Sequence, residues 1–179
     1  MAVDFSQNHF ALFGLEASYL LDLAGLEQRF RVLQQQVHPD NFVNANAAEQ
    51  RVAMQWAVRV NEAFQTLKSP LARGRYLLKL RGVDTLEETN TSMPLPFLMQ
   101  QMELREALSD LKQSPRAANV EAQLEALQAD LNAQEKTLFA QLAIALESNL
   151  DEAAVTVRKL RFLEKLREEL DEVFALVDA

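Results

Sequence analysis

The sequence predicts an all-α protein made of two units. Alanine, leucine, glutamine and glutamate, which favour helix, dominate the 179 residues. Four glycines and five prolines are too few for a turn-rich β-sandwich or a glycine-rich dinucleotide fold. Residues 1–82 carry nine Lys/Arg against seven Asp/Glu, whereas residues 83–179 carry nine against nineteen. This asymmetry predicts two domains with different partners, divided within a helix-breaking stretch at 82–91.

The first unit, residues 1–82, is expected to contain four helices. A short helix over 8–13 precedes one that is capped by Asp22 and ends near Val37. A third helix covers 47–67, and a fourth covers 70–80, where Ser69 and Pro70 form a typical helix start. Apolar residues at helical spacing predict the faces that pack together: Leu26, Phe30, Leu33 and Val37 in the second helix, and Ala53, Ala57, Val60, Phe64 and Leu67 in the third.

The second unit, residues 83–179, is expected to be a three-helix bundle. Its helices should cover 96–112, 116–147 and 152–177, and Ser114-Pro115 should start the middle one. Short loops between long apolar-striped helices favour an antiparallel bundle. The expected core residues are Phe97, Leu104, Leu108 and Leu111 in the first helix, Val120, Leu124, Leu127, Leu131, Leu138, Leu142 and Ala145 in the middle one, and Leu160, Leu163, Leu170 and Phe174 in the last.

Composition excludes several classes of function. The absence of cysteine excludes disulfides, thiolate metal sites and cysteine nucleophiles. The net charge of −8 argues against nucleic acid or an anionic membrane as the main partner. No targeting segment or membrane-spanning stretch is visible, so we expect a soluble cytoplasmic protein without a cofactor or metal.

The most informative segment is His38-Pro39-Asp40. Pro39 disfavours helix at His38, so the second helix should end there in a rigid corner that displays an imidazole and a carboxylate. A helix terminator with solvated polar neighbours is the alternative interpretation. A general base with its orienting carboxylate is another. However, no Ser or Cys nucleophile accompanies the pair, and the two histidines lack the spacing of a familiar metal site, so we do not expect an enzyme.

The surroundings of this triplet resemble a J-domain over about residues 6–70. The resemblance rests on the segment 10–15 (FALFGL), the triplet itself, and the helix segment 60–67 (VNEAFQTL). It implies docking on an HscA-type, DnaK-like chaperone and stimulation of that chaperone's ATP hydrolysis. The residues to which it assigns this role are His38, Pro39 and Asp40, helped by Arg29 and Arg31. Glutamines at 34–36 make the basic patch thinner than J-domains often have.

Three further blocks, at 69–80, 97–108 and 156–166, resemble the HscB family, the J-domain co-chaperones of iron–sulfur cluster assembly, in its bacterial form. This resemblance runs nearly end to end. It implies that the chain binds the scaffold protein IscU, delivers it to the chaperone and so promotes cluster transfer. A generic J-domain protein that recruits unfolded clients to a DnaK-type chaperone is the alternative.

A candidate scaffold surface also follows from helix geometry. At about 100° per residue, Met99 falls opposite the core stripe of helix 96–112, with Leu98 and Met102 on the flank. Phe162 likewise points away from the core stripe of the last helix. Such apolar residues rimmed by carboxylates indicate an interface, although scattered surface apolar residues are common. The resemblance assigns scaffold binding to Leu98, Met99, Met102, Glu103, Glu106, Asp110 and Phe162.

The basic run at 158–161 has two interpretations. It could contact nucleic acid, but a solvated helix face is favoured by the acidic residues one or two turns further along the helix. The expected partners of the run are Glu164, Glu168 and Glu169.

Overall fold

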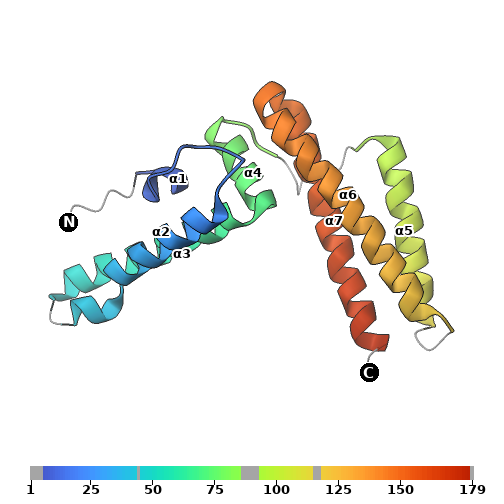
Figure 1. Cartoon of the computed structure of the whole chain (residues 1–179), viewed down its shortest axis with the longest axis horizontal. Coiled ribbons are helices and arrows are strands. Elements are labelled where there is room, and N and C mark those ends of the chain that lie inside the picture. The colour runs from blue at the N-terminus through green and yellow to red at the C-terminus, as the bar shows by residue number, and fades with distance from the viewer. Residues whose placement is uncertain (1–5, 44, 86–92, 115–117, 178–179) are drawn as a thin grey trace. The chain divides into compact units, whose positions relative to one another are not determined.

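The computed structural model describes residues 6–43, 45–85, 93–114 and 118–177, and within these ranges all regular structure is helical (Figure 1). The chain divides into two compact units, Met1–Leu80 and Arg81–Ala179. The prediction of an all-α fold is confirmed. Among the described residues, no helix combines the length and apolar character needed to cross a membrane.

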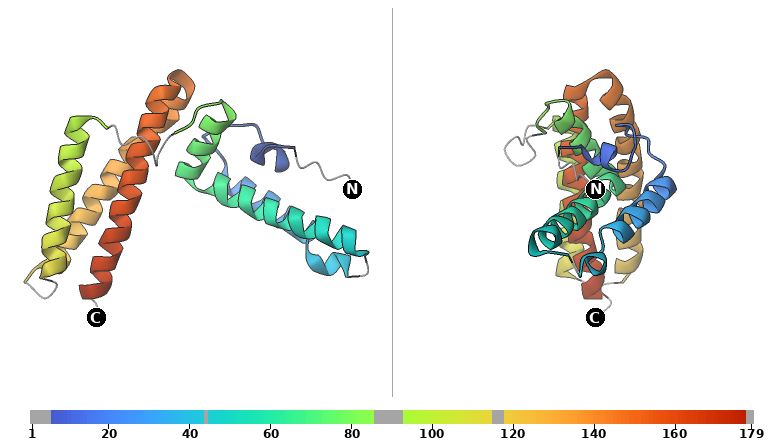
Figure 2. Two further views of the ribbon diagram at one scale, coloured as in Figure 1. Left: turned by 180° about the vertical axis from the view of Figure 1, so that it is seen from behind. Right: turned by 90° about the vertical axis from the view of Figure 1, so that its left-hand side faces the viewer.

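The first unit is built on an antiparallel helix pair. It contains α1 (His9–Leu12), α2 (Leu23–Gln36), the 3₁₀ turn η1 (Pro39–Phe42), α3 (Ala47–Lys68) and α4 (Pro70–Leu80). Helices α2 and α3 lie side by side, and η1 lies at the tip where the chain turns from one to the other (Figure 2). Both α1 and α4 pack against α3.

Local capping explains where these helices begin. The Asp22 carboxylate accepts a hydrogen bond from the Ala24 N–H (3.1 Å), as expected of the residue predicted to cap α2. The Ser69 hydroxyl accepts one from the Ala72 N–H (3.3 Å), and Pro70 is the first residue of α4, as predicted.

The core of the first unit forms around α3, against which α1, α2 and α4 pack. Phe30 and Phe64 stack with ring centroids 4.0 Å apart. Of the predicted inward residues, Phe30, Leu33 and Ala57 are only half-buried. Trp56 and Ala63 are buried as well, which the predicted stripe omitted.

The second unit is a three-helix bundle of α5 (Leu95–Gln113), α6 (Val120–Ser148) and α7 (Leu150–Val177). Helices α6 and α7 share the most extensive contact in the unit, and α5 lies against both. Most predicted core leucines are fully buried, whereas Phe97, Leu104, Leu127 and Phe174 are half-buried.

One buried amide connects α5 to α6. Gln101 is buried among the core side chains, and its Nε2 donates to Gln134 Oε1 (3.2 Å). Gln134 in turn donates from its own Nε2 to the Asp130 carboxylate (2.9 Å). Hydrophobic periodicity did not predict this contact, because a glutamine interrupts the apolar stripe.

The start of the middle helix differs from the prediction. Ser114 ends α5 rather than beginning the next helix, because its N–H donates to the Leu111 carbonyl (3.2 Å). Helix α6 begins only at Val120, after Asn119 in the left-handed conformation (φ 68°), which asparagine tolerates better than most residues. Two predicted features lie outside the described residues. These are Pro115 and Arg116 of the predicted helix start, and residues 86–91 of the predicted boundary.

The last helix begins earlier than predicted. The Asn149 side chain accepts hydrogen bonds from the Asp151 and Glu152 N–H groups (3.1 and 3.3 Å), so it caps α7 and allows the helix to start at Leu150. At the start of the same unit, Arg81 donates to the Leu146 carbonyl and pairs with Glu147 (3.5 Å).

Candidate functional site

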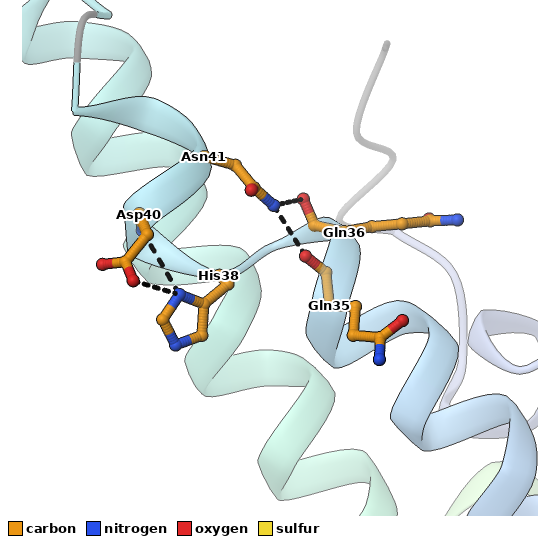
Figure 3. Close-up of polar contacts among 5 residues, drawn as sticks. All are labelled: Gln35, Gln36, His38, Asp40 and Asn41. Atoms are coloured by element: carbon orange, nitrogen blue, oxygen red, sulfur yellow. Dashed lines mark hydrogen bonds and ion pairs between the residues drawn. The ribbon is translucent and has the colours of Figure 1, made fainter.

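The corner at residues 38–40 is exposed and has the backbone form that its proline demands. His38 is extended (φ −60°, ψ 133°), as the residue before a proline should be, and Pro39 opens η1. The side chains of His38 and Asp40 are 56% and 84% exposed. An imidazole and a carboxylate are therefore displayed at the tip of the α2–α3 pair (Figure 3).

His38 and Asp40 contact each other through one ring nitrogen. The Asp40 N–H donates to His38 Nδ1 (3.3 Å), and the Asp40 carboxylate lies 3.4 Å from the same atom. The two contacts need different placements of the ring proton, because Nδ1 accepts from the N–H only when it carries no proton and donates to the carboxylate only when it carries one.

Two amide side chains brace the corner from either side. The Asn41 amide donates to the carbonyls of Gln35 (2.6 Å) and Gln36 (3.5 Å), which ties η1 to the last turn of α2 (Figure 3). The Gln50 amide of α3 lies within hydrogen-bonding distance of three carbonyls in the following loop, those of Phe42 (3.1 Å), Val43 (3.4 Å) and Ala45 (3.2 Å). The corner is thus fixed to both helices that flank it.

An apolar recess of about 510 Å³ lies beside the corner, between the end of α2 and the start of α3. The side chain that precedes the histidine, Val37, forms part of its wall, and Trp56 forms another part. The full lining is Gln36, Val37, Phe42, Ala48, Glu49, Val52, Ala53 and Trp56.

The two predicted arginines of α2 differ in their surroundings. Arg29 is exposed, but its Nη1 donates to the carbonyls of Phe13 (2.9 Å) and Gly14 (3.4 Å), so it holds the turn after α1. It lies about two helical turns before α2 ends at Gln36. Arg31 is exposed and forms no ion pair with any residue that the structure describes. The structure therefore brings His38 and Asp40 together but keeps Arg29 engaged elsewhere.

The second predicted surface lies on α5. Met99 and Met102 are 55% and 71% exposed, and Leu98 is half-buried. Three exposed carboxylates accompany them on the helix, those of Glu103, Glu106 and Asp110. Within the described ranges none of the three forms an ion pair or hydrogen bond, so their negative charge is unneutralised by neighbours in the unit.

Phe162 belongs to this face but does not project freely from α7. Its ring and that of Phe97 make an edge-to-face contact, with centroids 6.1 Å apart and an interplanar angle of 77°, and the Arg105 guanidinium lies 4.8 Å from the Phe162 centroid. Phe97 is therefore at the margin of the core, not inside it as predicted, because it is used for this contact between α5 and α7. We refer below to Leu98, Met99, Met102, Glu103, Glu106, Asp110 and Phe162 as the α5–α7 face.

The basic run on α7 is engaged within its own unit. Arg161 pairs with Glu164 (2.6 Å), as predicted, and Arg158 donates to the Thr85 carbonyl (3.0 Å). Glu169, which was expected to pair with this run, instead pairs with Arg105 of α5 (3.0 Å). No pairing of the run with Glu168 is found among the described residues.

The two histidines occupy separate environments in the first unit. The His9 ring lies tilted at 42° to that of Tyr76 with ring centroids 4.2 Å apart, and burial lowers the pKa of His9, with Glu62 acting in the opposite direction. In the part of the chain that the structure describes, no three His, Cys, Asp or Glu side chains are grouped as a metal site would require.

Comparison with known proteins identifies the family. A co-chaperone HscB homologue from Paraburkholderia phymatum is 49% identical over 166 residues, which cover 92% of this chain and 93% of that protein. Residues 93–171 match the family model described as the HSCB C-terminal oligomerisation domain. The chain belongs to the HscB co-chaperone family.

Solved HscB structures share the whole fold. HscB from Vibrio cholerae is 39% identical, with a TM-score of 0.84 over 96% of this chain and 99% of that one. The human co-chaperone HscB is 31% identical, with a TM-score of 0.87 over 96% of this chain and 84% of that one. As an HscB-family member, the chain is a J-domain co-chaperone of iron–sulfur cluster assembly.

Sequence reasoning missed three side chains that shape the candidate sites of this HscB-family member. Asn41 and Gln50 brace the corner, and Arg105 contacts Phe162. An asparagine shortly after a helix-ending proline was a usable signal, since its amide can bond the last helical carbonyls. Gln50 and Arg105 gave no such signal, because their partners belong to other elements.

Proposed function

We propose that the chain binds an IscU-type scaffold protein, delivers it to an HscA-type chaperone and stimulates that chaperone's ATPase, and thereby promotes iron–sulfur cluster transfer in the cytoplasm. The observation that supports this proposal most directly is the exposed, braced corner at His38 and Asp40. The chain acts in this scheme as an adaptor without catalysis of its own.

The corner suits a regulator of another protein's ATPase. Hydrolysis takes place in the chaperone, so the co-chaperone needs only to bind the hydrolysis-competent state more tightly than the other states. A corner that is already fixed loses little conformational entropy on docking. The bonds from Asn41 and Gln50 supply that rigidity. We propose that His38, Pro39 and Asp40 make the contact.

The arginines of α2 are proposed to support docking electrostatically. Arg31 is exposed and without an ion-pair partner among the described residues, which suits a contact with an acidic chaperone surface. Arg29 is also exposed, and we propose that it contributes positive charge while its Nη1 holds the turn after α1.

The α5–α7 face is proposed to hold the scaffold. Two exposed methionines provide adaptable apolar contacts, and the unpaired carboxylates beside them attract positively charged side chains. A scaffold with apolar side chains flanked by lysine or arginine would complement this face. Binding to both partners raises the local concentration of the scaffold near the chaperone.

A coupled ATPase assay with purified chaperone and scaffold tests the proposal. Asp40→Asn should abolish stimulation while scaffold binding, measured by calorimetry, is retained. Met99→Ala combined with Phe162→Ala should weaken scaffold binding and leave scaffold-independent stimulation intact. The chain alone should hydrolyse no ATP. If both variants behaved like the wild type, the assignment of the two sites would be wrong.

A competition assay separates this function from that of a generic J-domain protein. The α5–α7 face is small and rimmed by acid, which suits one folded partner better than unfolded chains. Excess denatured model protein should therefore fail to displace the scaffold. Displacement by the denatured protein would support the generic function instead.

A further inference from the structure

Phe162 is contacted by two side chains of α5. The Phe97 ring makes an edge-to-face contact with it (centroids 6.1 Å apart), and the Arg105 guanidinium lies over its ring at 4.8 Å from the centroid. Aromatic rings favour both arrangements, because the ring face is electron-rich and the ring edge is electron-poor. The ring orientation is therefore determined by side chains that neither the family resemblance nor helix periodicity assigns to the face.

Arg105 is itself anchored on α7. Its Nη2 donates to Glu169 Oε1 (3.0 Å), and the two side chains are 44% and 45% exposed. The contacts thus run from Glu169 on α7 to Arg105 on α5, and from there back to Phe162 on α7. A planar guanidinium can form an ion pair at one edge and stack on a ring with its face, whereas an ammonium group lacks this geometry.

The position of Arg105 on α5 places it next to the apolar part of the face. At about 100° per residue, Arg105 lies within about 60° of both Leu98 and Met102, on the side of α5 that leads to the core stripe. Its guanidinium therefore occupies the boundary between the exposed apolar side chains of α5 and the ring of Phe162.

We infer that Arg105 is a positioning residue of the α5–α7 face, and that it acts by holding the Phe162 ring in the orientation that the scaffold binds. This inference rests on the proposed scaffold-binding function. A ring that is already held loses less rotational freedom when a partner covers it, so the face binds more tightly than the same residues would without Arg105.

Scaffold affinity in two backgrounds tests the inference. With the full chain and purified apo scaffold of the IscU type, Arg105→Ala should weaken binding about two- to ten-fold, the range expected when one side chain must be immobilised on binding. In a Phe162→Ala background, the same substitution should cause no further loss, because the ring on which Arg105 acts is absent. Arg105→Lys should recover only part of the affinity.

Lys112 provides a matched control. It is a second cation on α5 that pairs with a glutamate of α7, Glu172, at 3.2 Å, and no ring contact involves it among the described residues. Lys112→Ala should leave scaffold affinity unchanged. Aromatic NMR spectra of the free proteins should show a shifted Phe162 ring signal in Arg105→Ala and an unshifted one in Lys112→Ala.

The outcomes distinguish the inference from the function on which it rests. If Arg105→Ala weakened binding equally in both backgrounds, Arg105 would contact the scaffold directly and the positioning role would be wrong. The same conclusion would follow if Phe162→Ala weakened binding and Arg105→Ala did not. If Phe162→Ala itself left affinity unchanged, the positioning role would be wrong. Scaffold binding by the face would be refuted as well if Met99→Ala combined with Phe162→Ala also left affinity unchanged.

Discussion

The corner at 38–40 and the α5–α7 face obtain fixed shapes in different ways. The corner is a continuous segment of chain, set by a proline and braced by nearby amides that bond backbone carbonyls. The face combines side chains from two helices. The two helices are connected there by the contacts that Phe162 of α7 makes with Phe97 and Arg105 of α5. The corner therefore depends on local backbone geometry, whereas the face depends on the packing of the bundle.

The largest expected difference between the two regions is in stability, when a substitution creates a cavity in the bundle of the second unit. Leu142 is fully buried on α6, so Leu142→Ala should reduce the free energy of unfolding of the second unit by about 2–5 kcal/mol. Hydrogen exchange should show weaker protection across 118–177 and unchanged protection in α2 and α3. A uniform loss in both units would mean that they unfold together, and the comparison would fail.

Removal of charge from the face should have the next largest effect. Replacement of Glu103, Glu106 and Asp110 by their amides should weaken scaffold binding about tenfold at low salt, given that exposed ion pairs contribute about 0.2–1 kcal/mol each. The salt dependence of binding, measured by calorimetry, should flatten as well. Glu121→Gln and Glu125→Gln on α6 together with Asp171→Asn on α7, all exposed positions, remove the same three charges and are the control for net charge. An equal loss in that control would indicate long-range attraction rather than contact at the face.

Loosening the corner should have a smaller effect on stability and a selective effect on function. Asn41→Ala removes the amide that ties η1 to α2, which should lower the free energy of unfolding by about 0.5–1.5 kcal/mol. Chaperone ATPase stimulation should fall several-fold, and scaffold affinity should stay unchanged.

Asp22→Ala is the matched control for this experiment. It removes a side-chain hydrogen bond at the opposite end of α2, with a comparable expected loss of stability. Stimulation should persist in this variant. Equal losses of stimulation in Asn41→Ala and Asp22→Ala would show that general stability, and not the brace, controls docking.

The smallest expected effect is a pH dependence of the first unit, which contains both histidines of the chain. Burial against Tyr76 lowers the pKa of His9 in the folded state below the ordinary value of 6.5. As the pH falls through 6.5, the unfolded chain takes up the proton first, so stability decreases until the pH is below the folded pKa.

Urea denaturation followed by the fluorescence of the single tryptophan, Trp56, measures this dependence in the first unit. His9→Phe retains a ring and removes the titrating group. The free energy of unfolding of this variant should therefore change less than that of the wild type between pH 7.5 and pH 5, which lie about one unit or more on either side of the ordinary histidine pKa. An unchanged pH dependence in this variant would assign the effect to other groups.

Local signals in the sequence predicted most of the fold. The bounds of α2 follow from Asp22 and Pro39, and the start of α4 follows from Ser69 and Pro70, because these residues act on the adjacent backbone. A similar Ser-Pro pair at 114 was misleading, because the hydrogen bond from the Ser114 N–H closes α5 instead. A serine before a proline is compatible with the end of one helix as well as with the start of another.

Contacts between helices were less predictable. Helix periodicity placed Met99 and Met102 on the surface, and both are exposed. Periodicity did not reveal three contacts between elements. The Arg29 side chain donates to the Phe13 carbonyl, the half-buried Phe97 contacts Phe162, and Glu169 pairs with Arg105. Each of these contacts depends on which residue of another element lies opposite, and that is fixed only when the helices pack.

The pairing of Gln101 with Gln134 has a consequence for the outer surface of α5. The buried leucines of α5 already oppose rotation of the helix about its axis, because a turn would expose them to water. A turn of one residue, about 100°, would also separate the buried amide from its acceptor, at a further cost of about 1–3 kcal/mol. The inward glutamine thus adds a directional constraint on the rotational setting of α5, and that setting decides which side chains the helix presents to a partner protein.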